Sequence, residues 1–466
     1  MYLFPEFSAN QQSNNVVYLI SAKDSLEKLK LSKEQKSFLE DVLKEDDFVQ
    51  INNYNTVTTF CNVKDLNQDA NKEKLRHLGY KVYESTKKSC VDLQIESSSP
   101  LAVELFSEGF SLGSYQFNKY FTDKKKIKLK RIYTTNKSAN LTRLSGIVDA
   151  TIWARDLVNE PVSYLTAPQL AKEIATKCKG TSITVEILGK SKIKALKMGG
   201  LLAVNFGSVD PPTFTIIEYK SKSAKNKKPI VLVGKGVVYD TGGLSLKPTK
   251  GSMDSMKCDM AGAAMMAATV IAAEKLKLPV HLIALIPATD NRPGGNAYTP
   301  GDVITMYDGT TIEVLNTDAE GRMILADALS YAKKFKPELV IDAATLTGAA
   351  AAAIGPHASI AMGNAPQKEF DLLSKAGFAS HDRIVQFPFW EEYLEPMKST
   401  IADMKNVGGS YGGMITAGKF LEHFTDYPYI HIDIAGPAFL ETKDSYRGLG
   451  GTGAGVRLLV EFLARK

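Results

Sequence analysis

The pattern of hydrophobic and polar positions divides the chain into two parts. In roughly the first 137 residues, short β-rich runs alternate with polar helical stretches that contain many Asn, Ser, Lys and Gln residues. After a helical stretch at residues 139–158, which we interpret as a connecting helix, apolar strands alternate with helices up to the C-terminus. Such alternation is typical of a mainly parallel sheet covered by helices. We therefore predict a smaller N-terminal α/β domain at 1–137 and a larger C-terminal α/β domain at 138–466 with a mixed, mainly parallel central sheet flanked by helices.

Runs of apolar residues predict the main elements of the second domain. Strands are expected at 230–233, 281–287, 339–346 and 429–434, and helices at 259–273, 323–334 and 455–463. In the first domain, residues 126–130 alternate lysine with apolar residues, which predicts a strand with one charged face. In open α/β sheets, ligands bind beyond the carboxyl ends of the strands. Charged residues that directly follow the predicted strands are therefore candidates for a functional site.

Composition is that of an ordinary globular protein and excludes several classes. The chain has 466 residues, of which 44% are hydrophobic and 23% charged, enough for two domains with cores of their own. Its four cysteines are far apart and form no CxxC pair, which argues against a zinc knuckle or a dense disulfide framework. Neither an HExxH motif nor a GxxxxGK[ST] phosphate loop occurs. The N-terminal residues MYLFPEFSANQQ lack the features of a signal peptide, so we expect a cytoplasmic protein that does not associate with membranes.

The formal net charge of +6 is too small, over this length, to indicate nucleic-acid binding by itself. Basic residues do cluster at 124–131 and at 222–228. A solvated strand face explains the first cluster best, because no aromatic residues lie between the lysines to stack on bases. DNA binding therefore stays a less favoured alternative.

Two segments of the second domain carry charged residues close to predicted elements. The segment 234–247 follows an apolar strand and places Lys235, Asp240 and Lys247 in a glycine-rich stretch. Glycines let a backbone approach a ligand closely, and a solvated lysine is unexpected directly after an apolar strand. In the second segment, Asp259 begins a predicted helix of small residues, where a helix cap is the simpler interpretation.

A third segment, 316–322 with the sequence NTDAEGR, places Asp318, Glu320 and Arg322 at alternate positions. If the segment is extended, all three side chains point the same way. Two carboxylates on one side repel each other unless a cation lies between them, and either Arg322 or a divalent ion would serve. Solvated charges at the end of a strand are the alternative for this segment taken alone.

Taken together, the three segments predict a two-metal centre. Asp240, Asp259, Asp318 and Glu320 carry four negative charges, which two divalent ions would balance. Paired ions can bind both the attacking and the leaving atoms of a hydrolysis and lower the pKa of a water between them. Oxygen-rich sites suit Mn, Mg or Zn. The six histidines are too dispersed for a His-ligated site.

The segments VGKGVVYDTGGLSLK, MKCDMAGAA and NTDAEGR resemble the three signature segments of the leucyl (cytosol) aminopeptidase family, in its bacterial form. The resemblance extends from about Trp153 to the C-terminus and includes WARDLVNEP, ATLTGA and HIDIAG. The first domain resembles the variable domain of the family only in size and α/β character. Membership would imply a metal-dependent aminopeptidase that releases N-terminal residues from peptides, with leucine and other apolar residues preferred.

The resemblance also implies a division of the ligands between two metal sites. The tighter site would use Lys235, Asp240, Asp259 and Glu320. The more exchangeable site would use Asp240, Asp318 and Glu320, together with the backbone carbonyl of Asp318. The ions would be Zn or Mn, with Mg as a further option. Lys235 would bind as a neutral amine, which requires a strongly lowered pKa that two nearby dications could supply.

Further roles implied by the resemblance concern residues that bind no metal. Lys247 would stabilise the oxyanion of the tetrahedral intermediate, and Arg322 would hold a bicarbonate that acts as the general base. The implied side-chain pocket consists of Met256, Thr345, Gly348, Ala435 and Ala438. Because members of the family assemble as hexamers, we expect a homohexamer. Two alternatives stay open: a dipeptidase, for example one that cleaves Cys-Gly, and a DNA-binding or scaffolding role beside catalysis.

Overall fold

The structure is a computed structural model that describes residues 6–9, 13–21, 26, 29, 31–54, 56–87, 90–123 and 128–466. The chain divides into two compact units. The first comprises Met1–Ile152 together with Thr442–Leu449, and the second comprises Trp153–Glu441 together with Gly450–Lys466. The first unit therefore continues past the boundary expected at residue 137, and it also includes a short segment from near the C-terminus.

The first unit contains a six-stranded sheet with the order β1-β6-β5-β2-β4-β3. Its strands are β1 (Glu6–Ala9), β2 (Asn15–Ser21), β3 (Phe48–Asn52), β4 (Val57–Val63), β5 (Asp92–Glu96) and β6 (Arg131–Thr134), and its helices are α1 (Lys33–Glu45), α2 (Asp69–Thr86) and α3 (Pro100–Gly113). All paired strands run parallel except β3, which pairs with β4 in the antiparallel direction. Val17, Val82 and Phe106 belong to its buried core. These observations confirm the predicted α/β character.

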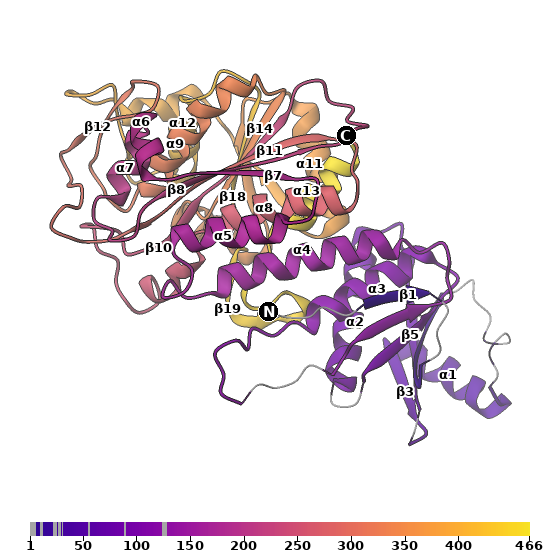
Figure 1. Cartoon of the computed structure of the whole chain (residues 1–466). Helices are drawn as coiled ribbons and strands as arrows, with labels where there is room; N and C mark the ends of the chain where they lie inside the picture. The colour runs from indigo at the N-terminus through magenta and orange to yellow at the C-terminus, as the bar shows by residue number, and fades with distance from the viewer. Residues whose placement is uncertain are drawn as a thin grey trace. The chain divides into compact units, whose positions relative to one another are not determined.

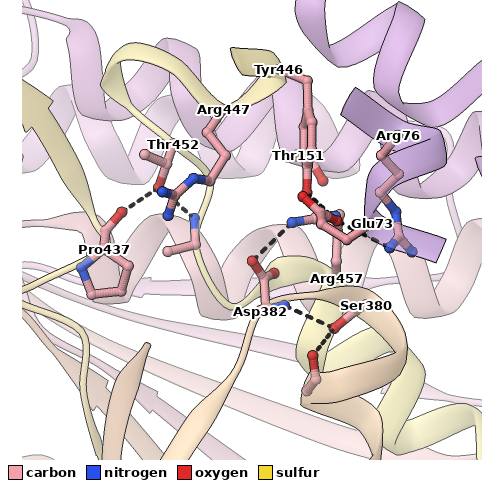
Figure 2. Close-up of polar contacts among 12 residues, drawn as sticks. Glu73, Arg76, Thr151, Ser380, Asp382, Pro437, Tyr446, Arg447, Thr452 and Arg457 are labelled. Atoms are coloured by element: carbon pink, nitrogen blue, oxygen red, sulfur yellow. Dashed lines mark hydrogen bonds and ion pairs between the residues drawn. The ribbon is translucent and has the colours of Figure 1, made fainter. Parts of the chain in front are cut away.

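The segment Thr442–Leu449 joins the first unit through a buried tyrosine. Tyr446 is fully buried and donates a hydrogen bond of 3.1 Å to Glu73 Oε2 (Figure 2). Glu73 also pairs with Arg76 one turn further along α2, and Arg76 in turn pairs with Glu108 at 2.9 Å. Because a buried charge is stable only when it is paired, this network ties the C-terminal segment to α2 and α3.

The strand predicted at residues 126–130 is not confirmed. Residues 126 and 127 lie outside the described part of the chain, and 128–130 have no regular structure. The strand β6 begins only at Arg131, whose guanidinium pairs with Asp92 at 3.2 Å. Lys128 and Lys130 are exposed, whereas Leu129 is buried. Within the alternating stretch, residues 128–130 are therefore irregular, and Leu129 is buried between two exposed lysines.

The second unit is built on a nine-stranded sheet with the order β16-β15-β18-β14-β9-β11-β8-β7, in which β10 also pairs with β11. Its strands are β7 (Thr184–Leu188), β8 (Thr213–Lys220), β9 (Ile230–Gly234), β10 (Gly236–Asp240), β11 (His281–Asn291), β14 (Leu339–Ala344), β15 (Ser359–Gly363), β16 (Ile384–Gln386) and β18 (Tyr429–Asp433). The central strands β18, β14, β9 and β11 are parallel, whereas β8, β7 and β15 join in the antiparallel direction. The predicted mixed, mainly parallel sheet is confirmed.

Helices cover both faces of this sheet: α5, α8 and α13 lie on one face, and α7, α9 and α12 on the other (Figure 1). The helices from the unit boundary onward are α4 (Leu141–Asn159), α5 (Ala167–Cys178), α6 (Lys190–Ala195), α7 (Gly199–Asn205), α8 (Ala261–Lys275), α9 (Glu320–Ala332), α10 (Gly348–Ile354), α11 (Gln367–Ser380), α12 (Gly413–Glu422) and α13 (Val456–Ala464). The remaining strands form two small sheets: β12 (Val303–Thr305), β13 (Thr311–Glu313) and β17 (Met404–Lys405), and β19 (Phe439–Asp444) with β20 (Gly448–Gly451).

Glycines bring α8 unusually close to the sheet. A Cβ atom on Gly262 would lie 2.0 Å from the carbonyl oxygen of Ala343, and one on Gly234 would lie 2.6 Å from the carbonyl oxygen of Gly262. Only glycine allows this approach. One helical stretch of the described residues, Met253–Lys275, is long and apolar enough to cross a membrane, but 89% of its most apolar window is buried inside the protein. It is the core helix of this unit.

Candidate metal centre

Four carboxylates from three separate segments come together at the carboxyl ends of the central strands. Lys235 directly follows β9, and Asp240 is the last residue of β10. Asp259 precedes α8, Asp318 lies in the turn before α9, and Glu320 is the first residue of α9. One oxygen each of Asp240, Asp318 and Glu320 lies within 4.8 Å of the others. The structure thus brings together the residues that the three sequence segments contributed.

Two lysines each bridge a pair of these carboxylates. Lys235 Nζ lies 2.8 Å from Asp259 Oδ1 and 2.9 Å from Glu320 Oε1. Lys247 Nζ lies 2.9 Å from Asp240 Oδ2 and 2.5 Å from Asp318 Oδ1. Because two ammonium groups face four carboxylates, the cluster keeps an excess of negative charge. An excess of negative charge of this kind favours the binding of a cation.

Burial shifts the pKa values of the acidic groups upward. Asp259 and Glu320 are almost fully buried, and this burial raises the pKa of both carboxyls. Asp318 is less buried; desolvation, and then the charges of Asp240 and Glu320, raise its pKa to about 7. The Asp318 carboxyl would therefore be partly protonated near neutral pH if no cation stabilised its charged form.

The pKa of the Lys235 amine is also raised, but for a different reason. Burial alone would lower its pKa, but the charges of Asp259, Glu320 and Asp240 outweigh burial and raise it. The lowered pKa that metal binding requires is therefore not a property of these side chains alone. It would have to come from the charge of bound dications.

Unpaired oxygens in the cluster fit a bound metal. Asp259 Oδ2 and Glu320 Oε2 are buried and have no hydrogen-bond partner among the described residues. Leaving a buried polar atom without a partner costs about 1–3 kcal/mol, and more for a charged group. A divalent ion would satisfy both oxygens, and this set of carboxylates with one amine suits Mn, Mg or Zn.

Asn291 was not singled out from the sequence, yet it orients one of the carboxylates. Its Nδ2 donates 2.8 Å to Asp240 Oδ1 and 3.0 Å to the carbonyl oxygen of Thr317. The backbone N–H of Gly242 donates a second hydrogen bond of 2.8 Å to the same Asp240 oxygen. Asp240 Oδ2 is left to face Lys247. Asn291 is the last residue of the apolar strand β11. A polar residue at the carboxyl end of a central strand was the signal by which the sequence could have identified it.

Two neighbours fix the position of Lys235. The carbonyl oxygen of Thr345, which follows β14, accepts a hydrogen bond of 3.1 Å from Lys235 Nζ. The hydroxyl of Thr345 donates to Asp259 Oδ1 at 2.7 Å. On the other side, a Cβ atom on Gly321 would lie 2.4 Å from Lys235 Cε. The absent side chain at position 321 therefore leaves the space that the lysine occupies.

Arg322 lies beside the cluster and not within it. The extended conformation considered for the segment Asp318–Arg322 is not found, because α9 already begins at Glu320. Arg322 Nη1 donates 2.8 Å to the carbonyl oxygen of Asn406, whereas its buried Nε has no partner among the described residues. Burial lowers the pKa of Arg322 to about 10, so the guanidinium is charged at neutral pH. Its free donor suits a small anion.

The residues expected to form the side-chain pocket lie at this edge of the sheet or, for Met256, in the short 3-10 helix Met253–Cys258 before α8. Met256 and Ala435 are half-buried, Gly348 is exposed at the start of α10, and Ala438 is buried. Only Thr345, of the expected five, has a described contact with the charged cluster. The pocket role of these residues stays a prediction.

Residues 152–460 match the sequence profile of the cytosol aminopeptidase family, catalytic domain. A probable cytosol aminopeptidase from Chlorobaculum parvum is 53% identical over 313 residues, which cover 66% of this chain and 61% of that protein. Among solved structures, the bottromycin maturation enzyme BotP in complex with Mn has a TM-score of 0.86 and 27% identity over 97% of this chain and 99% of its own. A mutant of tomato leucine aminopeptidase has a TM-score of 0.84 and 27% identity, over 99% of this chain and 97% of its own.

Proposed function

Because the chain belongs to the cytosol aminopeptidase family, we propose that it is a metal-dependent aminopeptidase that releases N-terminal residues from peptides, with leucine and other apolar residues preferred. The single observation that carries the proposal is the buried cluster of carboxylates around Lys235 and Lys247. The manganese complex of BotP, a protein similar along almost its whole length, supports a divalent metal at this centre. A cytoplasmic location and a homohexamer belong to the same proposal.

Two divalent ions, Zn or Mn with Mg as a further option, would be shared by five residues. Lys235, Asp240, Asp259 and Glu320 would hold the tighter ion. Asp240, Asp318 and Glu320 would hold the more exchangeable one, together with the Asp318 carbonyl. When bound, such a pair supplies Lewis-acid chemistry and lowers the pKa of a water between the ions.

Two cations of the chain itself would stabilise charge during the reaction. Burial alone would lower the pKa of Lys247, but Asp240 and Asp318 raise it, so the ammonium stays protonated. Its side chain is partly accessible at 15%, and from this position it would stabilise the oxyanion that forms on the scissile carbonyl. Arg322 would hold a bicarbonate through its free Nε donor, and a bicarbonate bound there would supply a general base.

The proposed metal centre also accounts for the requirement for a free N-terminus. A neutral α-amine is a metal ligand, whereas an internal peptide nitrogen is a poor one because its lone pair is delocalised into the amide. Asp259 would assist by accepting a hydrogen bond from that amine. The side chain of the N-terminal residue would bind in a pocket formed by Met256, Thr345, Gly348, Ala435 and Ala438. Apolar walls that include a methionine adapt to several side chains.

Hydrolysis of Leu-p-nitroanilide by the wild type and by Asp318→Ala tests the proposal. We expect the wild type to lose activity on chelation and to regain it with Mn²⁺, and the variant to have kcat/KM lower by about a hundredfold or more. Equal rates for the two proteins would contradict the mechanism. A panel of dipeptides, with Cys-Gly among them, measured beside aminoacyl-p-nitroanilides separates an aminopeptidase from a dipeptidase.

A further inference from the structure

Asn406 is a fully buried asparagine that directly follows β17. Its Oδ1 accepts hydrogen bonds from the N–H groups of Leu315 at 2.9 Å and Asn316 at 3.4 Å. Its Nδ2 donates 2.7 Å to the carbonyl oxygen of Asn316. One amide side chain therefore satisfies both a donor and an acceptor of the same short backbone segment.

The segment that Asn406 holds leads directly to a proposed metal ligand. Asn316 Oδ1 accepts a hydrogen bond of 2.8 Å from the N–H of Asp318. The carbonyl of Asn316 also accepts 3.2 Å from the N–H of Ala319. A continuous chain of hydrogen bonds thus runs from Asn406 through Asn316 to Asp318, and it fixes the turn from which the Asp318 carboxylate projects.

The backbone of Asn406 contacts a second residue of the centre. Its carbonyl oxygen accepts the 2.8 Å hydrogen bond from Arg322 Nη1. This contact orients the guanidinium while its Nε stays free of partners among the described residues. Asn406 therefore positions both residues. Its side chain holds the turn before Asp318, and its main-chain carbonyl holds the guanidinium of Arg322.

The position of Asn406 is itself fixed by the small sheet. Strand β17 pairs with β13 so that Met404 lies opposite Ile312 and Lys405 opposite Glu313. The N–H of Asn406 extends this ladder with a hydrogen bond of 3.0 Å to the carbonyl oxygen of Glu313. After Asn406 the chain enters the glycine-rich stretch 408–413, so Asn406 is the last residue held by the ladder.

We propose that Asn406 is a positioning residue that sets the placement of Asp318 relative to Arg322. The inference rests on the proposed function, because it gives these two residues their roles in metal and bicarbonate binding. Asparagine suits the position because it presents an acceptor and a donor side by side. An alanine keeps the carbonyl that holds Arg322 but releases the turn before Asp318, and an aspartate keeps only the acceptor.

The experiment compares Asn406→Ala and Asn406→Asp with a matched control, Asn205→Ala. Asn205 is also buried, and its Nδ2 donates to Asp210 and Thr289, outside the centre. Three kinds of measurement are made: the kinetic constants kcat and KM for Leu-p-nitroanilide, the affinities for two equivalents of Mn²⁺, and the free energy of unfolding. We expect Asn406→Ala to lower kcat and the affinity for the second Mn²⁺ by about tenfold to a hundredfold, with KM and the first Mn²⁺ unchanged. Asn406→Asp sets a carboxylate oxygen against the Asn316 carbonyl, which now accepts from Nδ2 at 2.7 Å, so it should lose at least as much kcat and second-site Mn²⁺ affinity as Asn406→Ala.

The control separates positioning from general destabilisation. Asn205→Ala should be destabilised to a similar extent and keep the kcat and both Mn²⁺ affinities of the wild type. The proposal is overturned if Asn406→Ala keeps the wild-type kcat and second Mn²⁺ affinity, or if Asn205→Ala loses both equally. If the wild type with Mn²⁺ hydrolyses nothing, the proposed function has failed, and the second Mn²⁺ affinity of the variants still decides whether Asn406 positions Asp318.

Discussion

Thr345 donates a hydrogen bond of 2.7 Å to Asp259, so a residue expected in the substrate pocket also holds a carboxylate of the charged cluster. The carbonyl of the same residue accepts from Lys235 at 3.1 Å. Thr345 is the first residue after β14, where a backbone carbonyl is no longer used by the sheet. Its side chain and its main chain therefore orient two proposed ligands of the tighter metal site at once.

Replacing Thr345 with valine removes the hydroxyl and keeps the branched shape. Asp259 then loses one donor, and its carboxylate is less well oriented for a metal. We expect the affinity for the first Mn²⁺ equivalent to fall by about tenfold, measured by competition with a metal-binding dye. Thr269→Val is the control, because Thr269 is also buried and donates only within α8, to the Met265 carbonyl. An affinity unchanged in Thr345→Val would show that the hydroxyl does not orient Asp259.

Gly321 offers a steric test of the lysine position. A Cβ atom there would lie 2.4 Å from Lys235 Cε and 2.6 Å from its Nζ. Because the end of a lysine is flexible, Gly321→Ala should displace Lys235 and leave α9 intact, with a helix-propensity gain of up to about 1 kcal/mol. We expect a folded protein that binds the first Mn²⁺ poorly and has a much lower kcat.

The matched variant for this test is Gly295→Ala. A Cβ atom on Gly295 would have nothing within 4 Å, so the affinity for Mn²⁺ should stay that of the wild type. Wild-type Mn²⁺ affinity in Gly321→Ala would mean that Lys235 is not a ligand. If Gly321→Ala fails to fold, as measured by circular dichroism, the added methyl group has displaced α9 and not the side chain of Lys235.

The residues of the charged cluster could be found from the sequence because they follow apolar strands or lie in distinctive short segments. Asn406 could not, because it follows a two-residue strand and lies far along the chain from the Asn316 backbone that it holds. The alternating Asp318 and Glu320 suggested an extended segment, yet α9 starts at Glu320. The residue at its N-cap position, Ala319, makes no capping hydrogen bond with its side chain, so the sequence gives no local signal for a helix start there. There, tertiary contacts such as the ion pair between Glu320 and Lys235 decide the local structure.

Metal affinity should depend on pH through Asp318. Burial, and then Asp240 and Glu320, raise its pKa to about 7. Below that pH the carboxyl is protonated when no metal is bound, and a metal must displace the proton. We expect the affinity for the more exchangeable ion to fall about tenfold for each pH unit below 7. Calorimetric titration with Mn²⁺ at pH 6 and pH 8, in buffers of different ionisation enthalpy, measures both the affinity and the protons released. A constant affinity and no proton release would contradict this expectation.

His431 should make the stability of the second unit depend on pH. Its Nδ1 lies 2.8 Å from Asp342 Oδ1, and both side chains are fully buried. Burial alone would lower the pKa of His431, but Asp342 outweighs burial and raises it. The pair therefore contributes stability that is fully present below the unfolded pKa of about 6.5 and is lost as the pH rises through the higher folded pKa.

The difference in free energy of unfolding between the wild type and His431→Gln should accordingly be largest near pH 6 and shrink toward pH 9. Denaturant titrations at several pH values measure it. An Asp342→Asn background lacks the charge that raises the pKa of His431. In that background, the change in free energy of unfolding caused by His431→Gln should no longer fall as the pH rises. If the effect falls equally in both backgrounds, another group titrates. If it grows with pH in the wild-type background, the histidine is neutral in the folded state and burial has outweighed Asp342.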